Sequence, residues 1–118
     1  MTEGVSYTNR LRNVKKNSHS LATAAPEVME SFEHFHQTAV ATGVLDTKTK
    51  ELMALAISVV KGCDDCIAHH AHDAIEAGAS REELVETLGL AVLMGGGPGM
   101  IYASHAIDAV DQFFEAAG

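Results

Sequence analysis

The feature that most constrains this chain is the helical spacing of apolar residues that runs from Pro26 almost to the C-terminus. Apolar side chains recur every three or four positions in this part, and no stretch alternates with a period of two. A half-buried strand needs that alternation, because its successive side chains point to opposite faces. The sequence therefore predicts an all-α fold of about five to six helices.

Caps and helix breakers place the boundaries of the first two predicted helices. Pro26 suits the first position of one helix, which we expect to stop at Gly43. Asp46 is a predicted N-cap for the next helix, which should end at Gly62. Apolar stripes support both helices: Val28, Phe32, Phe35 and Ala39 in the first, and Leu52, Leu55, Ala56, Val59 and Val60 in the second.

Further helices are expected downstream. The third begins at the cysteine pair and ends at Gly78, and Ser80 with Glu83 forms a capping box that opens the fourth. Residues 95–99 read Gly-Gly-Gly-Pro-Gly, which breaks a helix, so the fourth should stop near Met94. A last helix then carries an apolar seam suited to packing against another helix, including one of another subunit: Met100, Ala103, Ile107, Val110 and Phe114.

Length and composition describe one acidic domain. The chain has 118 residues, of which 47% are hydrophobic and 20% charged, and its formal net charge is −8. An acidic surface disfavours nucleic-acid binding, which requires cationic groups to neutralise phosphates. No apolar run approaches the ~18–20 residues that cross a bilayer, so we expect no membrane-spanning segment.

Residues 1–25 differ from the rest of the chain in charge and pattern. They carry four basic side chains against one acidic, are rich in Ser, Thr and Asn, and lack a strong apolar period. We expect a polar, basic and loosely held N-terminal arm, with a short helix around Leu11 and Val14, before a helical domain of residues 26–118. An organellar presequence competes with this interpretation, but no apolar segment or cleavage signal follows, and we expect a cytoplasmic protein.

The two cysteines, Cys63 and Cys66, lie at the predicted start of the third helix. Positions three apart in a helical turn place their Cβ atoms about 5–6 Å apart, close to what a disulfide needs. The positive end of the helix dipole favours the reactive thiolate. Asp64 and Asp65 oppose this effect, because anions beside a thiol disfavour its ionisation. The spacing predicts a pair that can form and break a disulfide.

A histidine and a glutamate are predicted to lie close to the cysteine pair and to transfer protons. His70 lies one helical turn after Cys66, where an imidazole can accept a thiol proton. If the helices on either side of Gly62 fold back antiparallel, Glu51 comes close to His70 and can orient its ring. The predicted relay is Glu51 to His70 to Cys66. Cys63 lies nearer the helix end, so we expect it to be the more accessible thiol, suited to resolving oxidised Cys66 and to exchange with an outside disulfide.

Other interpretations of these residues remain open. Cys63 and Cys66 could be small buried hydrophobic residues, or could bind zinc with two of three nearby histidines: His69, His70 and His72. Zinc is disfavoured because these ligands lie within ten residues on one helix and point to different sides. We interpret the remaining histidines as surface, helix-face or interface side chains without a catalytic role: His69, His72, His34, His36 and His105.

The spacing Glu51, eleven residues, then Cys63-x-x-Cys66-x-x-x-His70 resembles the alkyl hydroperoxidase D (AhpD) branch of the carboxymuconolactone decarboxylase superfamily. The resemblance covers most of residues 27–114. It implies an AhpD-like helical fold, homotrimers or hexamers, and a redox-active cysteine pair that works without metal or other cofactor. It also implies that Cys66 attacks a peroxide, that Cys63 resolves the disulfide and meets the partner, and that Glu51 and His70 relay protons.

The same resemblance implies partners for this protein, and the sequence differs from the family pattern at one position. Electrons would come from a dithiol donor such as a lipoyl group, and a peroxiredoxin is a further candidate partner. Family members often carry a histidine where this chain has Asp65, so one element of the relay is missing here. Disulfide reduction, lactone decarboxylation on the shared scaffold and a zinc-binding or structural helical oligomer are the alternatives, although the decarboxylase branch generally lacks the paired cysteines.

Overall fold

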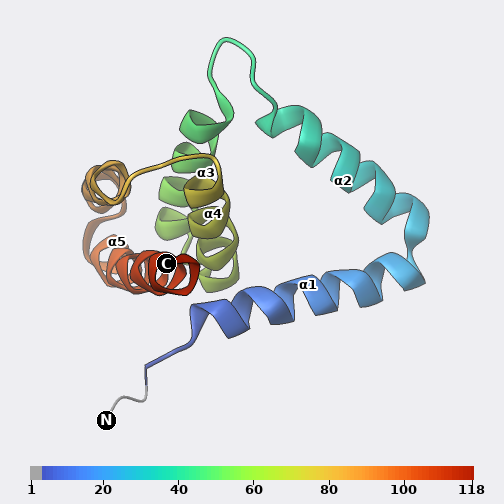
Figure 1. Ribbon diagram of the computed structural model, residues 1–118, viewed down its shortest axis with the longest axis horizontal. Helices are drawn as coiled ribbons and strands as arrows, with labels where there is room; N and C mark the ends of the chain where they lie inside the picture. Colours follow the sequence, from blue (N-terminus) through green and yellow to red (C-terminus); the bar gives the residue numbers. More distant parts are fainter. Residues whose placement is uncertain (1–3) are drawn as a thin grey trace.

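The computed structural model describes residues 4–118, which form five α-helices and, within that range, no strand (Figure 1). The all-α class predicted from the apolar period is confirmed. In chain order the helices are α1 (Tyr7–Ala24), α2 (Pro26–Val40), α3 (Thr47–Lys61), α4 (Asp64–Glu76) and α5 (Arg81–Ala117).

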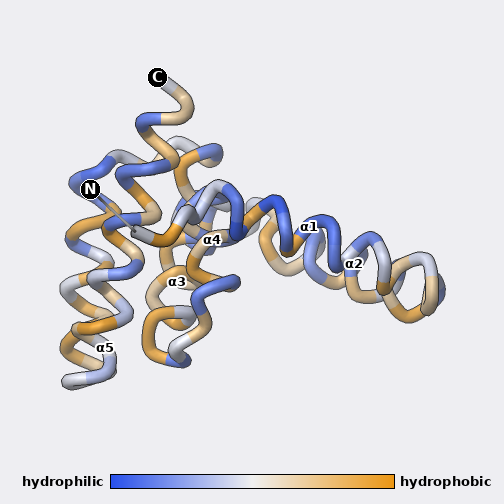
Figure 2. The backbone as a smooth tube through the Cα atoms, turned by 90° about the horizontal axis from the view of Figure 1, so that it is seen from below, coloured by the Kyte–Doolittle hydropathy of each residue, from blue (hydrophilic) through white to orange (hydrophobic). Residues whose placement is uncertain are grey.

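The helices divide into two regions. Helices α3, α4 and α5 pack against one another and form what we call the core bundle. Helices α1 and α2, which we call the N-terminal helix pair, extend away from it, as both views of the backbone show (Figures 1 and 2). The start of α1 lies against α4 and α5, whereas α2 contacts α1 and α3. The helix pair is therefore attached to the core bundle mainly through its first turns.

The predicted caps of the core bundle are confirmed. The Asp46 side chain accepts a hydrogen bond from the Thr49 amide at 2.8 Å and begins α3. Gly62 ends that helix in the left-handed conformation with φ of 69°, which an L side chain rarely adopts. Ser80 and Glu83 form the reciprocal capping box at the start of α5. These local signals fix where the core helices begin and end.

The N-terminal segment is more ordered than predicted. Instead of a short helix around Leu11, α1 is a continuous helix of 18 residues, and residues 1–3 of the predicted arm lie outside the described range. Tyr7 and Leu11 are buried against the core bundle, and the Tyr7 amide donates to the Gln112 side chain at 2.7 Å. This tertiary packing anchors a segment whose own apolar pattern is weak.

The predicted five-residue break in the glycine run is also wrong in its extent. Only Gly96 leaves helical geometry, with φ of 65° and ψ of −146°, so α5 consists of two helical halves. Pro98 falls in the first turn after the break, where its missing amide donor is not needed. The halves run antiparallel: Arg81 pairs with Asp111 at 2.7 Å, and Gly99 packs on the backbone of Ala91.

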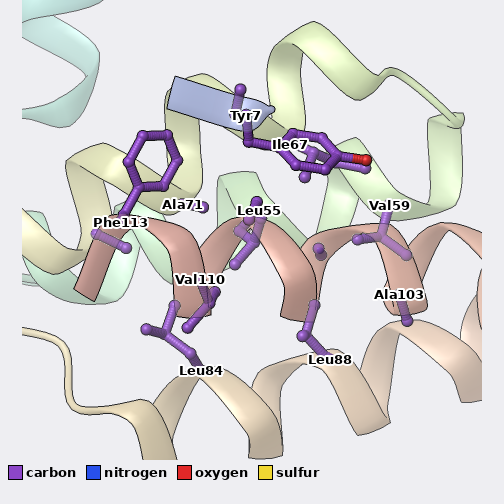
Figure 3. Close-up of a cluster of buried hydrophobic side chains, with 14 of the residues drawn as sticks. Tyr7, Leu55, Val59, Ile67, Ala71, Leu84, Leu88, Ala103, Val110 and Phe113 are labelled. Atoms are coloured by element: carbon purple, nitrogen blue, oxygen red, sulfur yellow. The ribbon is translucent and has the colours of Figure 1, made fainter. Parts of the chain in front are cut away.

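The core forms where the two halves of α5 face α3 and α4 (Figure 3). Its largest fully buried side chains are Leu55, Val59, Ile67, Leu84 and Val110. The predicted seam of the last helix is partly correct, because Ala103 and Val110 are buried while Met100 is exposed. The buried stripe passes instead through Ala106 and Phe113, which rotates the predicted face by about one position.

By length and composition alone, α5 is the one helix in residues 4–118 that could cross a membrane. The reversal at Gly96 turns it into a helical hairpin, and residues from both halves, including Leu84, Leu88 and Val110, belong to the buried core. We therefore interpret α5 as a core element of the bundle.

Candidate active site

The cysteine pair occupies the turn between α3 and α4. Cys63 is the N-cap of α4, and its sulfur accepts a hydrogen bond from the Cys66 amide at 3.2 Å. Cys63 and Cys66 form a disulfide, with their Cα atoms 5.2 Å apart. The predicted proximity of the two sulfurs at the helix start is therefore confirmed.

The predicted order of thiol accessibility is wrong. Cys66 is exposed, whereas Cys63 is only partly exposed. The cause is the packing of the turn against α5, where the Tyr102 ring lies 3.1 Å from the position that a Cβ at Gly62 would occupy. Tyr102 thus packs on the residue before Cys63, whereas Cys66 lies three positions after Cys63, in the first turn of α4.

Glu51 and His70 are in direct contact, as the antiparallel arrangement of α3 and α4 predicts. The Nδ1 atom of His70 lies 2.7 Å from Oε1 of Glu51. Glu51 is only 2% exposed, and a carboxylate buried to this extent needs a hydrogen-bonding partner. His70 is partly buried and lies one turn beyond Cys66 on α4. Within residues 4–118 no hydrogen bond joins His70 to either cysteine.

Asp64, between the cysteines, is held by two side chains that the sequence did not single out. The Tyr7 hydroxyl donates to its Oδ1 atom at 3.2 Å, and Nδ1 of His105 lies 3.0 Å from the same oxygen. Burial, and next the charge of Asp64, raise the pKa of Tyr7 to about 12, so its hydroxyl stays protonated as a donor. Because these residues are 41 to 57 positions from Asp64 in sequence, no local spacing indicated the contacts.

Asp65 is paired with Arg10 of α1 at 2.9 Å. The hydrogen bond that Arg10 donates to Asp65 raises the pKa of the guanidinium, which therefore keeps its positive charge beside the cysteine pair. Both side chains are partly exposed, so the pair contributes little to stability. Its local effect is to offset the negative charge that opposes thiolate formation. The basic N-terminal segment thus supplies part of the surroundings of the active-site turn.

His69 and His72 of α4, predicted as surface residues, are only partly exposed. Nε2 of His69 lies 2.9 Å from Oδ2 of Asp73, and Nδ1 of His72 lies 3.0 Å from Oδ1 of the same residue. Burial acts to raise the pKa of Asp73, but the hydrogen bonds from the two histidines lower it to about 2. The same contact with Asp73 raises the pKa of His69. The His69 ring also stacks on His70, with ring centroids 4.8 Å apart.

Two groups of side chains in residues 4–118 bring potential metal ligands together. They are His36 with His69 and Asp73, and Glu51 with His70 and Asp73; in each group the ligand atoms lie within 4.8 Å of one another. Neither group contains a cysteine, so the zinc site considered from the sequence does not form in this arrangement. His36, interpreted above as a helix-face or interface residue, lies 5.6 Å from His69 between ring centroids.

The fold agrees with comparisons to known proteins. The sequence pattern of the carboxymuconolactone decarboxylase family matches residues 26–109. An uncharacterised protein of Cupriavidus necator is 41% identical over 98 residues, which are 83% of this chain and 87% of that protein. The chain belongs to the carboxymuconolactone decarboxylase family, and it is an AhpD-like member.

Solved structures support the same assignment. A carboxymuconolactone decarboxylase family protein of Legionella pneumophila, in its apo form, superposes with a TM-score of 0.88 at 40% identity, covering 91% of this chain and 96% of that one. A family member from Thermotoga maritima, described as possibly involved in antioxidative response, has a TM-score of 0.81 at 29% identity, covering 92% of each chain. The alkyl hydroperoxide reductase AhpD of Mycolicibacterium paratuberculosis is 42% identical over 57 residues, 48% of this chain but 32% of that protein.

Proposed function

We propose that this protein is a thiol-dependent peroxidase and disulfide oxidoreductase that uses Cys63 and Cys66. The observation that carries the proposal is the disulfide at the start of α4 together with the 2.7 Å contact between His70 and a buried Glu51. A reversible dithiol at a helix N-terminus, with an oriented imidazole one turn away, is the arrangement that thiol catalysis requires. The likeness to AhpD supports the same chemistry.

In the proposed reaction the reduced Cys66 thiol is the nucleophile, since it is the more exposed of the two. His70 accepts its proton, and Glu51 stabilises the resulting imidazolium. The thiolate attacks the terminal oxygen of a hydroperoxide, so an S–O bond forms and the O–O bond breaks. The departing alkoxide takes the proton from His70 and leaves as an alcohol, while Cys66 becomes a sulfenic acid.

Cys63 then completes the cycle. Its thiolate attacks the sulfur of oxidised Cys66, the disulfide forms, and the sulfenic oxygen leaves as water after protonation. A small dithiol of the dihydrolipoyl type reduces the disulfide in two exchange steps and is itself oxidised to a disulfide. With a protein disulfide in place of the peroxide, the same exchange gives a disulfide reductase, and a peroxiredoxin is a candidate substrate for that reaction.

The decisive experiment measures peroxide reduction with dihydrolipoamide as the reductant in a metal-free preparation. We expect Cys66→Ser to abolish turnover, and Cys63→Ser to allow one oxidation of Cys66 but no regeneration through an intramolecular disulfide. His34→Asn, a substitution at an exposed histidine of α2, is the matched control and should keep wild-type turnover. Full activity in Cys66→Ser would contradict the mechanism, and turnover of a lactone by the double cysteine variant would favour the decarboxylase alternative.

Glu51 is proposed as a positioning residue that acts through His70. Glu51→Gln keeps the volume and one hydrogen bond but removes the negative charge, so we expect a loss of about 10²-fold in the rate of thiol oxidation. We expect kcat to fall while KM stays unchanged, because Glu51 contacts His70 and neither cysteine. A folded Glu51→Gln protein with wild-type kcat would show that Glu51 has only a structural role.

We also propose a homo-oligomer, a trimer or a hexamer, in the cytoplasm. The support is the apolar face of α2, where Val28, Phe32 and Phe35 are 68%, 58% and 66% exposed. A row of large apolar side chains of this kind on a single protomer is typical of a subunit interface. Light scattering at micromolar concentration should give a mass of three or six protomers, and a monomer would contradict the proposal.

A further inference from the structure

A mixed cluster of two imidazoles and a carboxylate lies beside the proposed relay and has no part in it. His69 and Asp73 stand one turn apart on α4, and His36 reaches the same place from α2. One ligand atom from each of the three lies within 4.8 Å of the other two. The cluster thus draws its members from two separate elements, which is how metal sites are commonly built.

The pairing of these side chains suits a cation. Both carboxylate oxygens of Asp73 face imidazole nitrogens: Oδ2 lies 2.9 Å from Nε2 of His69, and Oδ1 lies 3.0 Å from Nδ1 of His72. Nε2 of His36 is buried and has no hydrogen-bonding partner in the described part of the chain. A buried ring nitrogen without a partner is uncommon, and coordination of a metal would satisfy it.

The cluster also has access from solvent. It lines one end of a cavity of about 780 Å³ that is bounded by α1, α2 and α4. Lys15 and His19 of α1 line the same cavity, together with Glu33 of α2. A hydrated ion can therefore enter, and room remains for water at coordination positions that the three side chains leave open.

We propose that His36, His69 and Asp73 form a binding site for a divalent transition metal of the zinc class. Two imidazole nitrogens and one carboxylate oxygen are ligands that Zn²⁺ and its neighbours accept, and three protein ligands leave at least one position for water. Binding would replace the hydrogen bond between His69 and Asp73 by coordination of both, and the proton between them would be released to solvent.

The second possible group, Glu51 with His70 and Asp73, is less suitable. Glu51 and His70 already satisfy each other at 2.7 Å, and Glu51 is almost fully buried. A metal there would have to break this contact, whereas at the proposed site it would supply the partner that His36 lacks. The His36 side chain therefore distinguishes the two groups.

The site would join two parts of the molecule that are otherwise weakly connected. α2 contacts α1 and α3, and the metal would link it directly to α4, the helix that carries Cys66 and His70. Because its ligands exclude both cysteines, the site should bind metal equally well when the disulfide is formed. This independence separates the inference from the proposed thiol chemistry, since either can fail without the other.

The test uses the full-length protein with its disulfide oxidised, so that no thiol competes for the metal. Equilibrium dialysis against Zn²⁺ should give one equivalent per chain with micromolar or tighter affinity. His36→Ala should weaken binding by about tenfold or more, since it removes one of three ligands. His34→Ala, two positions away on the exposed side of α2, is the matched control and should bind like the wild type.

Asp73→Asn provides a second variant, in case the His36 side chain also affects packing. It keeps the size of Asp73 but removes the anionic ligand, and we expect a similar loss of Zn²⁺ affinity. Co²⁺ in place of Zn²⁺ gives an independent readout, because its visible absorption reports coordination by imidazole and carboxylate. Absence of Zn²⁺ binding by the oxidised wild type, or binding that His36→Ala leaves unchanged, would overturn the proposal.

Discussion

The core bundle and the N-terminal helix pair are built from similar helical patterns, yet they differ in what covers their apolar faces. In the core bundle Leu55, Ile67 and Leu84 are completely buried. In α2 no residue is buried, although its spacing of apolar residues is as regular as that of α3. An amphipathic pattern therefore identifies a helix and its apolar face but leaves the partner of that face undetermined.

The cysteine pair lies where these two regions meet. Its helix and its relay residues belong to the core bundle, whereas Tyr7 and Arg10, which hold the aspartates between the cysteines, belong to α1. The charged surroundings of the pair therefore depend on how the N-terminal helix pair is attached. Substitutions in each region and at the junction test this division.

The largest effect is expected in the core bundle. Leu55→Ala leaves a cavity among completely buried side chains and should lower the free energy of unfolding by about 2–5 kcal/mol, measured by urea denaturation. Phe35→Ala removes a larger side chain from the exposed face of α2. It should change the mass measured by light scattering while altering the stability of the protomer by less than about 0.5 kcal/mol. If Phe35→Ala destabilised the protein as much as Leu55→Ala and left its mass unchanged, the apolar face of α2 would be part of the protomer's core and not a subunit interface.

The reversal of α5 comes next in size. Gly96 has a positive φ that only glycine adopts easily, so Gly96→Ala should destabilise the protein by about 1–3 kcal/mol. Nothing lies within 4 Å of the added Cβ, so the cost would arise from the backbone conformation and not from a steric clash. Gly97→Ala is the matched control, because its Cβ also meets nothing and its backbone is helical. It should be neutral or stabilise by up to about 1 kcal/mol, and identical thermal shifts for both variants would be evidence against the break.

The pair of His69 and Asp73, on the side of α4 that faces α2, should make stability depend on pH. The folded pKa of Asp73 is about 2, below its unfolded value, so its contribution is present above about pH 4 and is lost as the pH falls toward 2. The raised pKa of His69 acts oppositely: its contribution is present below about pH 6.5 and is lost above its folded pKa. The pair therefore stabilises the fold most between these limits.

Asp73→Asn measures this contribution. In metal-free buffer it should cost up to about 2 kcal/mol near pH 5.5 and much less near pH 2, where the wild-type carboxylate becomes protonated. Urea denaturation at the two pH values gives the difference. A loss of stability independent of pH would show that Asp73 acts through packing and not through its charge.

The smallest effect on stability is expected at the junction itself. The Arg10–Asp65 pair is partly exposed, so Arg10→Gln should change the free energy of unfolding by less than about 1 kcal/mol and only at low salt. The reactivity of the cysteine pair should change more clearly, because Asp65 then lacks its counter-charge. We expect slower alkylation of the reduced thiols at neutral pH, with Lys16→Gln on the exposed part of α1 as a control. If Arg10→Gln and the wild type were alkylated at equal rates, Arg10 would have no electrostatic effect on the cysteine pair.

The sequence predicted the core helices well because their boundaries depend on local chemistry. Asp46, Gly62 and the Ser80–Glu83 box act within one turn of their own positions, and all three are confirmed. The contact between Glu51 and His70 was predictable for a related reason, since a short turn at Gly62 leaves little freedom in how α3 and α4 pair. The extent of the glycine break could not be predicted, because a single residue at positive φ is enough to reverse the chain.

Contacts across long stretches of sequence could not be predicted. Tyr7, Arg10 and His105 reach the aspartates between the cysteines, and His36 reaches His69, without a pattern that marks any of them. The accessibility of the two cysteines was also wrongly predicted, and a long-range contact lies beside them, because Tyr102 of α5 packs against Gly62. Each of these depends on the packing of whole helices.

Local sequence was enough to predict the helices of residues 26–118, most of their ends, and the cysteine pair with its histidine one turn away, because hydrogen bonds within a helix and its caps act over a few residues. The full extent of α1, the buried faces, the more exposed cysteine and the charges around the pair became clear only from the packing of the helices. Burial and electrostatics depend on distances in space, and residues as far apart as Tyr7 and Asp64 become neighbours only when the N-terminal helix packs on the core bundle.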